Sequence, residues 1–230
     1  MSISSALNNA LSGLTVSSRS ADVVSSNIAN AMTEGYGVRS LDIGSRIGAR
    51  DGSGAQVLGV LRDSDPVLTG QRRGSDADLA EATVKAAFLR EVEDVVGLPN
   101  QASSLSARMA EFEAHLVNAA NGPHDEIRLT AAVDAADSLV TAFRDMSGQI
   151  QAMRERADAA IGAAVTDVNQ SLAGIADLNA KIRAIPDRSG DLSALLDAQT
   201  RLVDRLATQI PVETRRDATG SLQVRSLIHI

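Results

Sequence analysis

The first 36 residues constrain the fold more than any other stretch, because their apolar residues follow a single helical stripe. Those residues recur at spacings of three, four or seven: Ile3, Leu7, Leu11, Leu14, Ala21, Ile28 and Met32. Ser18 and Ser25 fill the remaining positions, and on the other faces of the helix only Arg19 and Asp22 are charged. This spacing is typical of the seam of a coiled coil. So thin a seam does not stabilise a helix alone, so we expect it to pack against other subunits.

The composition favours helices with narrow seams over a compact enzyme core. Aromatic residues make up only 2% of the 230 residues, and much of the 44% that is hydrophobic is Ala. The net charge is −7 with acids and bases interleaved, which argues against nucleic acid and anionic membranes as partners. The absence of Cys excludes a disulfide framework. No stretch approaches the ~20 apolar residues that span a bilayer.

Beyond Tyr36 the pattern changes to short extended stretches and then to long helices. Weak alternation over 38–43 and an apolar run over 56–61 predict a small β region near residues 38–61, with a turn at 51–54. Helices are predicted from Asp65-Pro66 to Val96, from about Ser104 to Asn121, from near Asp125 to before Pro186, and over 191–209. Gly70 and Gly74 predict that the first of these becomes firm only from Ser75.

The third of these helices determines the shape that we expect for the body of the protein. It would hold roughly 55–60 residues and measure ~80–90 Å, so it must lie against the other helices. Residues 212–216 and 222–230, with a turn at 217–220, predict a C-terminal β-hairpin. We therefore expect a mainly α protein in three parts. They are a detached, coiled-coil-type N-terminal helix with its turn (1–36), an elongated helical bundle with the short β region (37–210), and the start of a truncated β region (211–230).

The stretch Ser26–Tyr36 carries a recognisable motif. It reads S-N-I-A-N-A-M-T-E-G-Y, and it resembles the signature S-N-I-A-N-x-x-T-x-G-Y shared by flagellar rod, hook and hook-associated proteins. It departs from that family at Met32 and Glu34, and the basic residue expected just after the motif comes late, at Arg39. The residues expected to form the turn are Asn27, Asn30, Thr33, Gly35 and Tyr36. Asn bonds local backbone and Gly accepts a positive φ, so we interpret the motif as a geometric switch from helix to strand.

The helical middle resembles the flagellar hook-associated protein 1 (FlgK) family. The similarity covers Asp65-Pro66, Gln101–Leu105, Phe112, Asn121–Arg128, Val168–Ile182 and Asp191–Asp197. The resemblance implies a structural, non-enzymatic subunit of the hook–filament junction, exported by the flagellar type III apparatus to the bacterial flagellum and needing no cofactor. Its implied partners are the hook, the second junction protein, copies of itself in a helical assembly, and an export chaperone. The family continues into further β domains and a C-terminal helix, so we expect this chain to be an N-terminal portion.

Two other functions remain open at this stage. A coiled-coil adaptor or export-related helical binding module would share the long seam, but it would leave the motif at 26–36 unexplained. A metal hydrolase would use His115 and His124 with Glu111 or Glu113, yet only Glu111 and His115 are set one helical turn apart, and a metal needs three ligands in one place. An exposed ion pair explains that pair more simply. We therefore predict no catalytic, metal or cofactor site.

Overall fold

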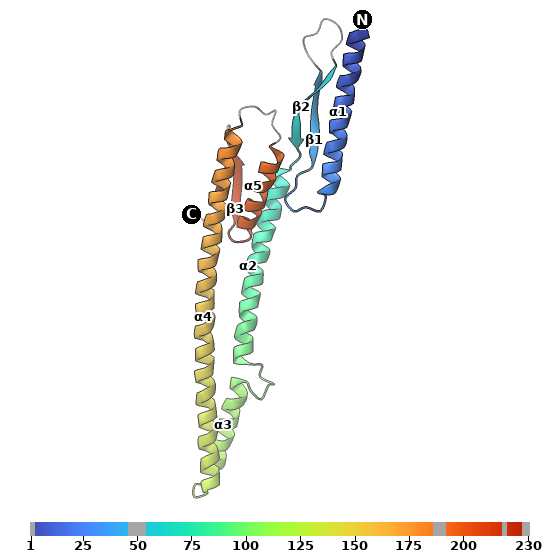
Figure 1. Cartoon of the computed structure of the whole chain (residues 1–230). Coiled ribbons are helices and arrows are strands. Elements are labelled where there is room, and N and C mark those ends of the chain that lie inside the picture. The colour runs from blue at the N-terminus through green and yellow to red at the C-terminus, as the bar shows by residue number, and fades with distance from the viewer. Residues whose placement is uncertain (1–2, 46–53, 186–191, 218–219, 227–230) are drawn as a thin grey trace. The chain divides into compact units, whose positions relative to one another are not determined.

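The computed structural model describes residues 3–45, 54–185, 192–217 and 220–226. The expected mainly α class, with its small β region and C-terminal hairpin, is confirmed. The elements in chain order are α1 (Ile3–Ala29), β1 (Arg39–Ser45), β2 (Ala55–Arg62), α2 (Pro66–Val96), α3 (Leu105–Ala120), α4 (Glu126–Arg183), α5 (Ser193–Ala207), β3 (Val212–Arg216) and β4 (Leu222–Ser226) (Figure 1). They form two compact units: Met1–Asp78 with Thr166–Ile230, and Leu79–Val165. Helices α2 and α4 each contribute to both units.

The helix boundaries follow local capping chemistry. The Asp65 carboxylate accepts hydrogen bonds from the backbone N–H groups of Val67 and Leu68 at 2.9 and 3.0 Å, which caps α2. The Ser104 hydroxyl accepts from Ala107 N at 3.2 Å and caps α3 in the same way. The expectation that α2 becomes firm only from Ser75 was wrong, because α2 is helical from Pro66. The Asp65 cap secures its first turn and offsets the helix-weakening effect of the two glycines.

The two hairpins are antiparallel and each has two strands. In the first, Arg39 pairs with Arg62 and Ser45 pairs with Ala55, and the register shifts between Asp42 and Ile43. Leu58 is the extra residue of this β-bulge, and it lies over Gly44, where an added Cβ would come within 2.7 Å of its side chain. In the second hairpin, Val212 pairs with Ser226. Most of the turn expected at 51–54, half of the turn expected at 217–220, and residues 227–230 of the last strand lie outside the described residues.

The core of the first unit is small and lies between α4, α5 and the second hairpin. Ile175, Val203 and Leu206 are buried there. The partly buried apolar residues that surround them are Val168, Leu202, Val212, Leu222 and Val224. The fully buried Gln199 donates from Nε2 to Asn179 Oδ1 at 2.9 Å. The Asn179 amide in turn exchanges two hydrogen bonds with the backbone of Leu222, at 2.8 and 2.9 Å, which joins α4 to β4.

The second unit is built only from helices: the C-terminal part of α2, α3 and the N-terminal part of α4. Its buried apolar residues are mostly small, namely Ala119, Ala132, Ala135 and Met153. Arg156 of α4 pairs with Glu91 of α2 at 2.7 Å, and Arg108 of α3 donates to Ser138 of α4. Small side chains allow helices to approach closely, which is the packing that the Ala-rich, aromatic-poor composition favours.

Candidate functional site

The predicted seam residues all lie exposed on the surface of the described structure; six of them are on α1, and Met32 lies in the turn that follows the helix, which ends at Ala29. The exposed fractions of the large ones run from 52% for Leu11 to 98% for Met32, and Ala21 is also exposed. The full set is Ile3, Leu7, Leu11, Leu14, Ala21, Ile28 and Met32. None of the 27 residues of α1 is buried. The helix therefore presents an apolar stripe, interrupted by Ser18 and Ser25, that its own described chain leaves uncovered.

The opposite side of α1 faces the β1–β2 hairpin, beside which the helix lies (Figure 1). At 100° per residue, this second stripe is centred roughly 180° from the seam. Its partly buried members are mostly small or polar: Asn9, Ser12, Val16, Ser20, Val23 and Asn27. The expectation of a detached helix was therefore wrong. Contact with the hairpin uses the polar side of α1, and this contact leaves the apolar side outward.

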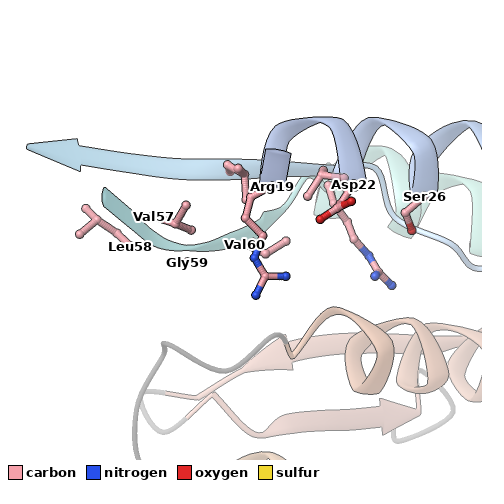
Figure 2. Close-up of a pocket in the computed structure, with 10 residues that line it drawn as sticks. Arg19, Asp22, Ser26, Val57, Leu58, Gly59 and Val60 are labelled. Carbon is pink, nitrogen blue, oxygen red and sulfur yellow. The ribbon is translucent and has the colours of Figure 1, made fainter. Parts of the chain in front are cut away.

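A hollow of about 510 Å³ separates part of α1 from the first hairpin. Figure 2 shows Arg19, Asp22 and Ser26 of α1 on one side and residues 57–60 of β2 on the other. Arg39 and Leu41 of β1 also line it. Its polar groups do not form a pair of carboxylates or a nucleophile with its base, so the hollow offers no evident acid–base chemistry.

Asn27 and Tyr36 form the centre of the corner that follows α1. The Asn27 side chain donates to Arg39 O at 2.8 Å and accepts from Arg39 N at 3.0 Å, so it pairs with β1 as a neighbouring strand would. The Tyr36 hydroxyl donates to Asn27 Oδ1 at 2.9 Å and lies 3.2 Å from Ser26 Oγ. The guanidinium of Arg39 stacks over the Tyr36 ring at 4.8 Å. These contacts connect the last turn of α1 to the first residue of β1.

The other three motif residues shape the backbone of the corner. Asn30 donates from Nδ2 to Ser26 O at 2.9 Å, and Thr33 Oγ1 lies 3.2 Å from Asn30 Oδ1. Gly35 has φ +75°, a conformation that disfavours residues with a Cβ. An added Cβ there would also come within 2.5 Å of Arg201 Cγ on α5. Both the positive φ and the close approach of Arg201 therefore favour glycine at position 35.

Asp197 of α5 anchors this corner, and the sequence analysis did not assign it that role. It is only 3% exposed. Its carboxylate accepts from Gly37 N at 3.0 Å, from Arg39 at 3.0 Å and from Arg62 at 2.7 Å. Asp204 lies seven residues further along α5, on the same side, and pairs with Arg72 and Arg73 at 2.7 Å. The seven-residue spacing of these two acids was the sequence signal that could have pointed to this role, because it places both on one side of the helix. Their arginine partners lie more than 120 residues away in the sequence.

The residues considered for a metal site fall in the second unit. Glu111, Glu113 and His115 lie on α3, and His124 lies between α3 and α4. Across the part of the chain that the structure describes, no group of three or more His, Cys, Asp or Glu could hold a metal ion. Within that same part, no helix is both long enough and apolar enough to cross a bilayer.

Comparison with known proteins gives two family matches and several curated relatives. The family model described as the flagellar hook-associated protein FlgK helical domain matches residues 89–226, and that of the flagella basal body rod protein matches residues 7–36. Flagellar hook-associated protein 1 of Salmonella typhimurium is 28% identical over 218 residues, which cover 92% of this chain and 39% of that protein. The protein of the same name in Escherichia coli K12 is 26% identical over 230 residues, 96% of this chain and 42% of the relative. The chain thus spans about two fifths of the length of these relatives.

Proposed function

Because this chain belongs to the FlgK family of flagellar hook-associated proteins, we propose that it is a structural subunit that joins the flagellar hook to the filament. The observation that carries this proposal is the outward seam of α1. In a protein that acts alone, the apolar side of a helix turns inward. In α1 the polar side takes the intramolecular contact, and so the apolar side is left for helices of neighbouring subunits.

The energy available from the seam supports a role inside an assembly. Burying a Leu or Ile side chain fully is worth ~1.5–3 kcal/mol, so Ile3, Leu7, Leu11, Leu14 and Ile28 together supply roughly 7–15 kcal/mol. Association costs about 4–15 kcal/mol in lost freedom of motion. A single seam contact between two free molecules is therefore weak. A site already formed by several aligned subunits reduces that cost, which restricts binding to the growing structure.

The motif residues act in this proposal by setting the direction of α1. Asn27, Asn30, Thr33, Gly35 and Tyr36 hold the turn between α1 and β1, and Asp197 ties that turn to α5. We assign residues 1–36 to the axial contact, residues 37–210 to the helical body, and residues 211–230 to a C-terminal β region. The mechanism is packing, with no chemical step.

The partners of the assembled subunit are the hook, the second junction protein and other copies of the chain. We further propose that an export chaperone binds the subunit and that the flagellar type III apparatus exports it. The family of the chain and the names of its curated relatives support the flagellar setting.

Binding of the labelled protein to purified hooks of the parent bacterium tests the function. The variant carries Leu7→Ser, Leu11→Ser and Leu14→Ser, which removes apolar seam area while leaving the hairpin-facing side of α1 intact. The matched control is Val24→Ser, because Val24 is 54% exposed on the same helix but lies off the seam. We expect wild type and the control to label hook ends under the electron microscope, and the seam variant to be lost from them. Equal labelling by the seam variant would refute the proposal.

A further inference from the structure

A second surface of the first unit gathers five arginines from three elements. Arg62 of β2, Arg72 and Arg73 of α2, and Arg215 and Arg216 of β3 line an open hollow of about 850 Å³, here called the arginine pocket. The acidic residues in its lining are Glu34, Asp63 and Asp204. The lining therefore carries a net charge of +2, in a chain whose total is −7.

The arginines of this pocket fall into two groups by their partners. Arg62 pairs with Asp197, and Arg72 and Arg73 pair with Asp204, each at 2.7 Å. The described hydrogen bonds of Arg216 go instead to neutral oxygens, Gly220 O at 3.1 Å and Gln199 Oε1 at 3.2 Å. Among the described residues, no carboxylate lies within salt-bridge distance of Arg215 or Arg216. The β3 side of the pocket therefore has charge that the described carboxylates of its own unit do not pair with.

The environment of Arg216 also disfavours its charge. Burial lowers the pKa of the Arg216 guanidinium, and repulsion from Arg62 lowers it further. A carboxylate entering the pocket would relieve this repulsion and replace the lost solvation. Arginine forms two parallel hydrogen bonds with a carboxylate, which makes the attraction directional as well as strong.

The net negative charge of the chain lies almost entirely in the other unit. Residues 79–165 hold thirteen acidic and seven basic residues, a net charge of −6. The remaining residues hold sixteen acidic and fifteen basic residues, a net charge of −1. The arginine pocket, at +2, and the acidic unit, at −6, therefore carry charges of opposite sign, as two complementary surfaces do.

We propose that the arginine pocket of one copy binds carboxylates of the acidic helical unit, Leu79–Val165, of a second copy. This contact joins two different surfaces, so it is heterologous and extends from copy to copy into a ring or a filament. The inference rests on the proposed function in that both require copies of the chain to associate. It uses a surface separate from the seam of α1, so the two contacts can be tested apart.

Sedimentation velocity of the full chain over a concentration series, in 20 mM and 500 mM NaCl, measures this contact. The pocket variant is R215E with R216E. The control is R144E with R154E, which makes the same change in net charge at two exposed arginines of α4 in the acidic unit. Arg216→Gln, which keeps an amide donor in place of the charge, and Arg215→Glu alone serve as milder variants. Far-UV circular dichroism confirms that each variant is folded.

We expect wild type to associate at low salt and to dissociate at high salt. The pocket variant should weaken association by about tenfold or more, and the control should not weaken it. Association should persist when Leu7, Leu11 and Leu14 are changed to Ser. Three results would overturn the inference: no association of wild type at low salt, equal weakening by the control, or association lost only in the seam variant. The last result would leave the proposed function intact.

Discussion

Helices α1 and α5 belong to the same unit, and their sequences both follow a helical period, yet their surroundings are opposite. Helix α5 has 15 residues, and six of them are buried. Helix α1 has 27 residues, and none is buried. The apolar side of α5 faces its own core, whereas the apolar side of α1 faces away from its own chain. Periodicity predicts that a helix has a contact side, but it does not say which molecule supplies the contact.

Replacing one leucine by alanine in each helix should give the largest difference in the free energy of unfolding between the two helices. Leu206→Ala in α5 removes a side chain that is only 1% exposed, so it should lower the free energy of unfolding by ~2–5 kcal/mol. Leu11→Ala in α1 should change it by less than about 0.5 kcal/mol. Urea unfolding followed by circular dichroism at 222 nm measures both. A comparable loss in the two variants would mean that α1 is buried in solution, and the comparison would fail.

Much of the fold is readable in the sequence because local chemistry determines it. The Asp65-Pro66 pair places the start of α2, and the Asn121-Gly122-Pro123 run places the end of α3. Asn179 lies on a helical stripe with Ile175 and Ile182, and Gln199 lies on one with Leu196 and Val203. This spacing predicts inward positions for both polar residues, and the structure places both against the core. Each of these signals lies within a few residues of the feature that it predicts.

The anchoring of the corner could not be read in the same way. Asp197 meets Arg39 and Arg62 across 158 and 135 residues, and pairing of charges has no periodic signal. An acid on a helix is usually solvated, so Asp197 reads as surface until the fold brings two arginines to it. The side of α1 that meets the hairpin was hidden for a related reason: small polar residues such as Ser12 and Ser20 look like a solvent-facing side. A hairpin that approaches closely, as Gly54 does at Ser12, prefers such residues.

Removing a carboxylate from each helix should give an intermediate effect. Asp197→Asn leaves Arg39 and Arg62 with one neutral acceptor in place of a charged one, so stability should fall by ~2–3 kcal/mol. Asp22→Asn in α1 is the matched control, and it should change stability by less than about 0.5 kcal/mol, since Asp22 is exposed. The same urea titration measures both variants. If Asp197→Asn were as mild as the control, Asp197 would not be the anchor of the corner.

Two asparagines allow the finest version of the comparison, because they make the same bonds in the two settings. Asn27 bonds both backbone groups of Arg39, and Asn179 bonds both backbone groups of Leu222. Each asparagine also accepts one side-chain hydrogen bond, Asn27 from Tyr36 and Asn179 from Gln199. Asn27→Ala should cost ~1 kcal/mol, since water can reach the freed groups of Arg39 and Tyr36 beside α1. Asn179→Ala should cost about 2 kcal/mol, because it leaves the fully buried Gln199 without this acceptor.

Hydrogen exchange measured by mass spectrometry separates these two variants further. Asn27→Ala should speed exchange over residues 36–45 and leave α5 unchanged. Asn179→Ala should speed exchange in β4 and also in α5, because Gln199 connects the asparagine to that helix. If both variants sped hydrogen exchange in α5 equally, then the corner and the core would form one cooperative structure. In that case the contrast between α1 and α5 would be one of surface exposure only.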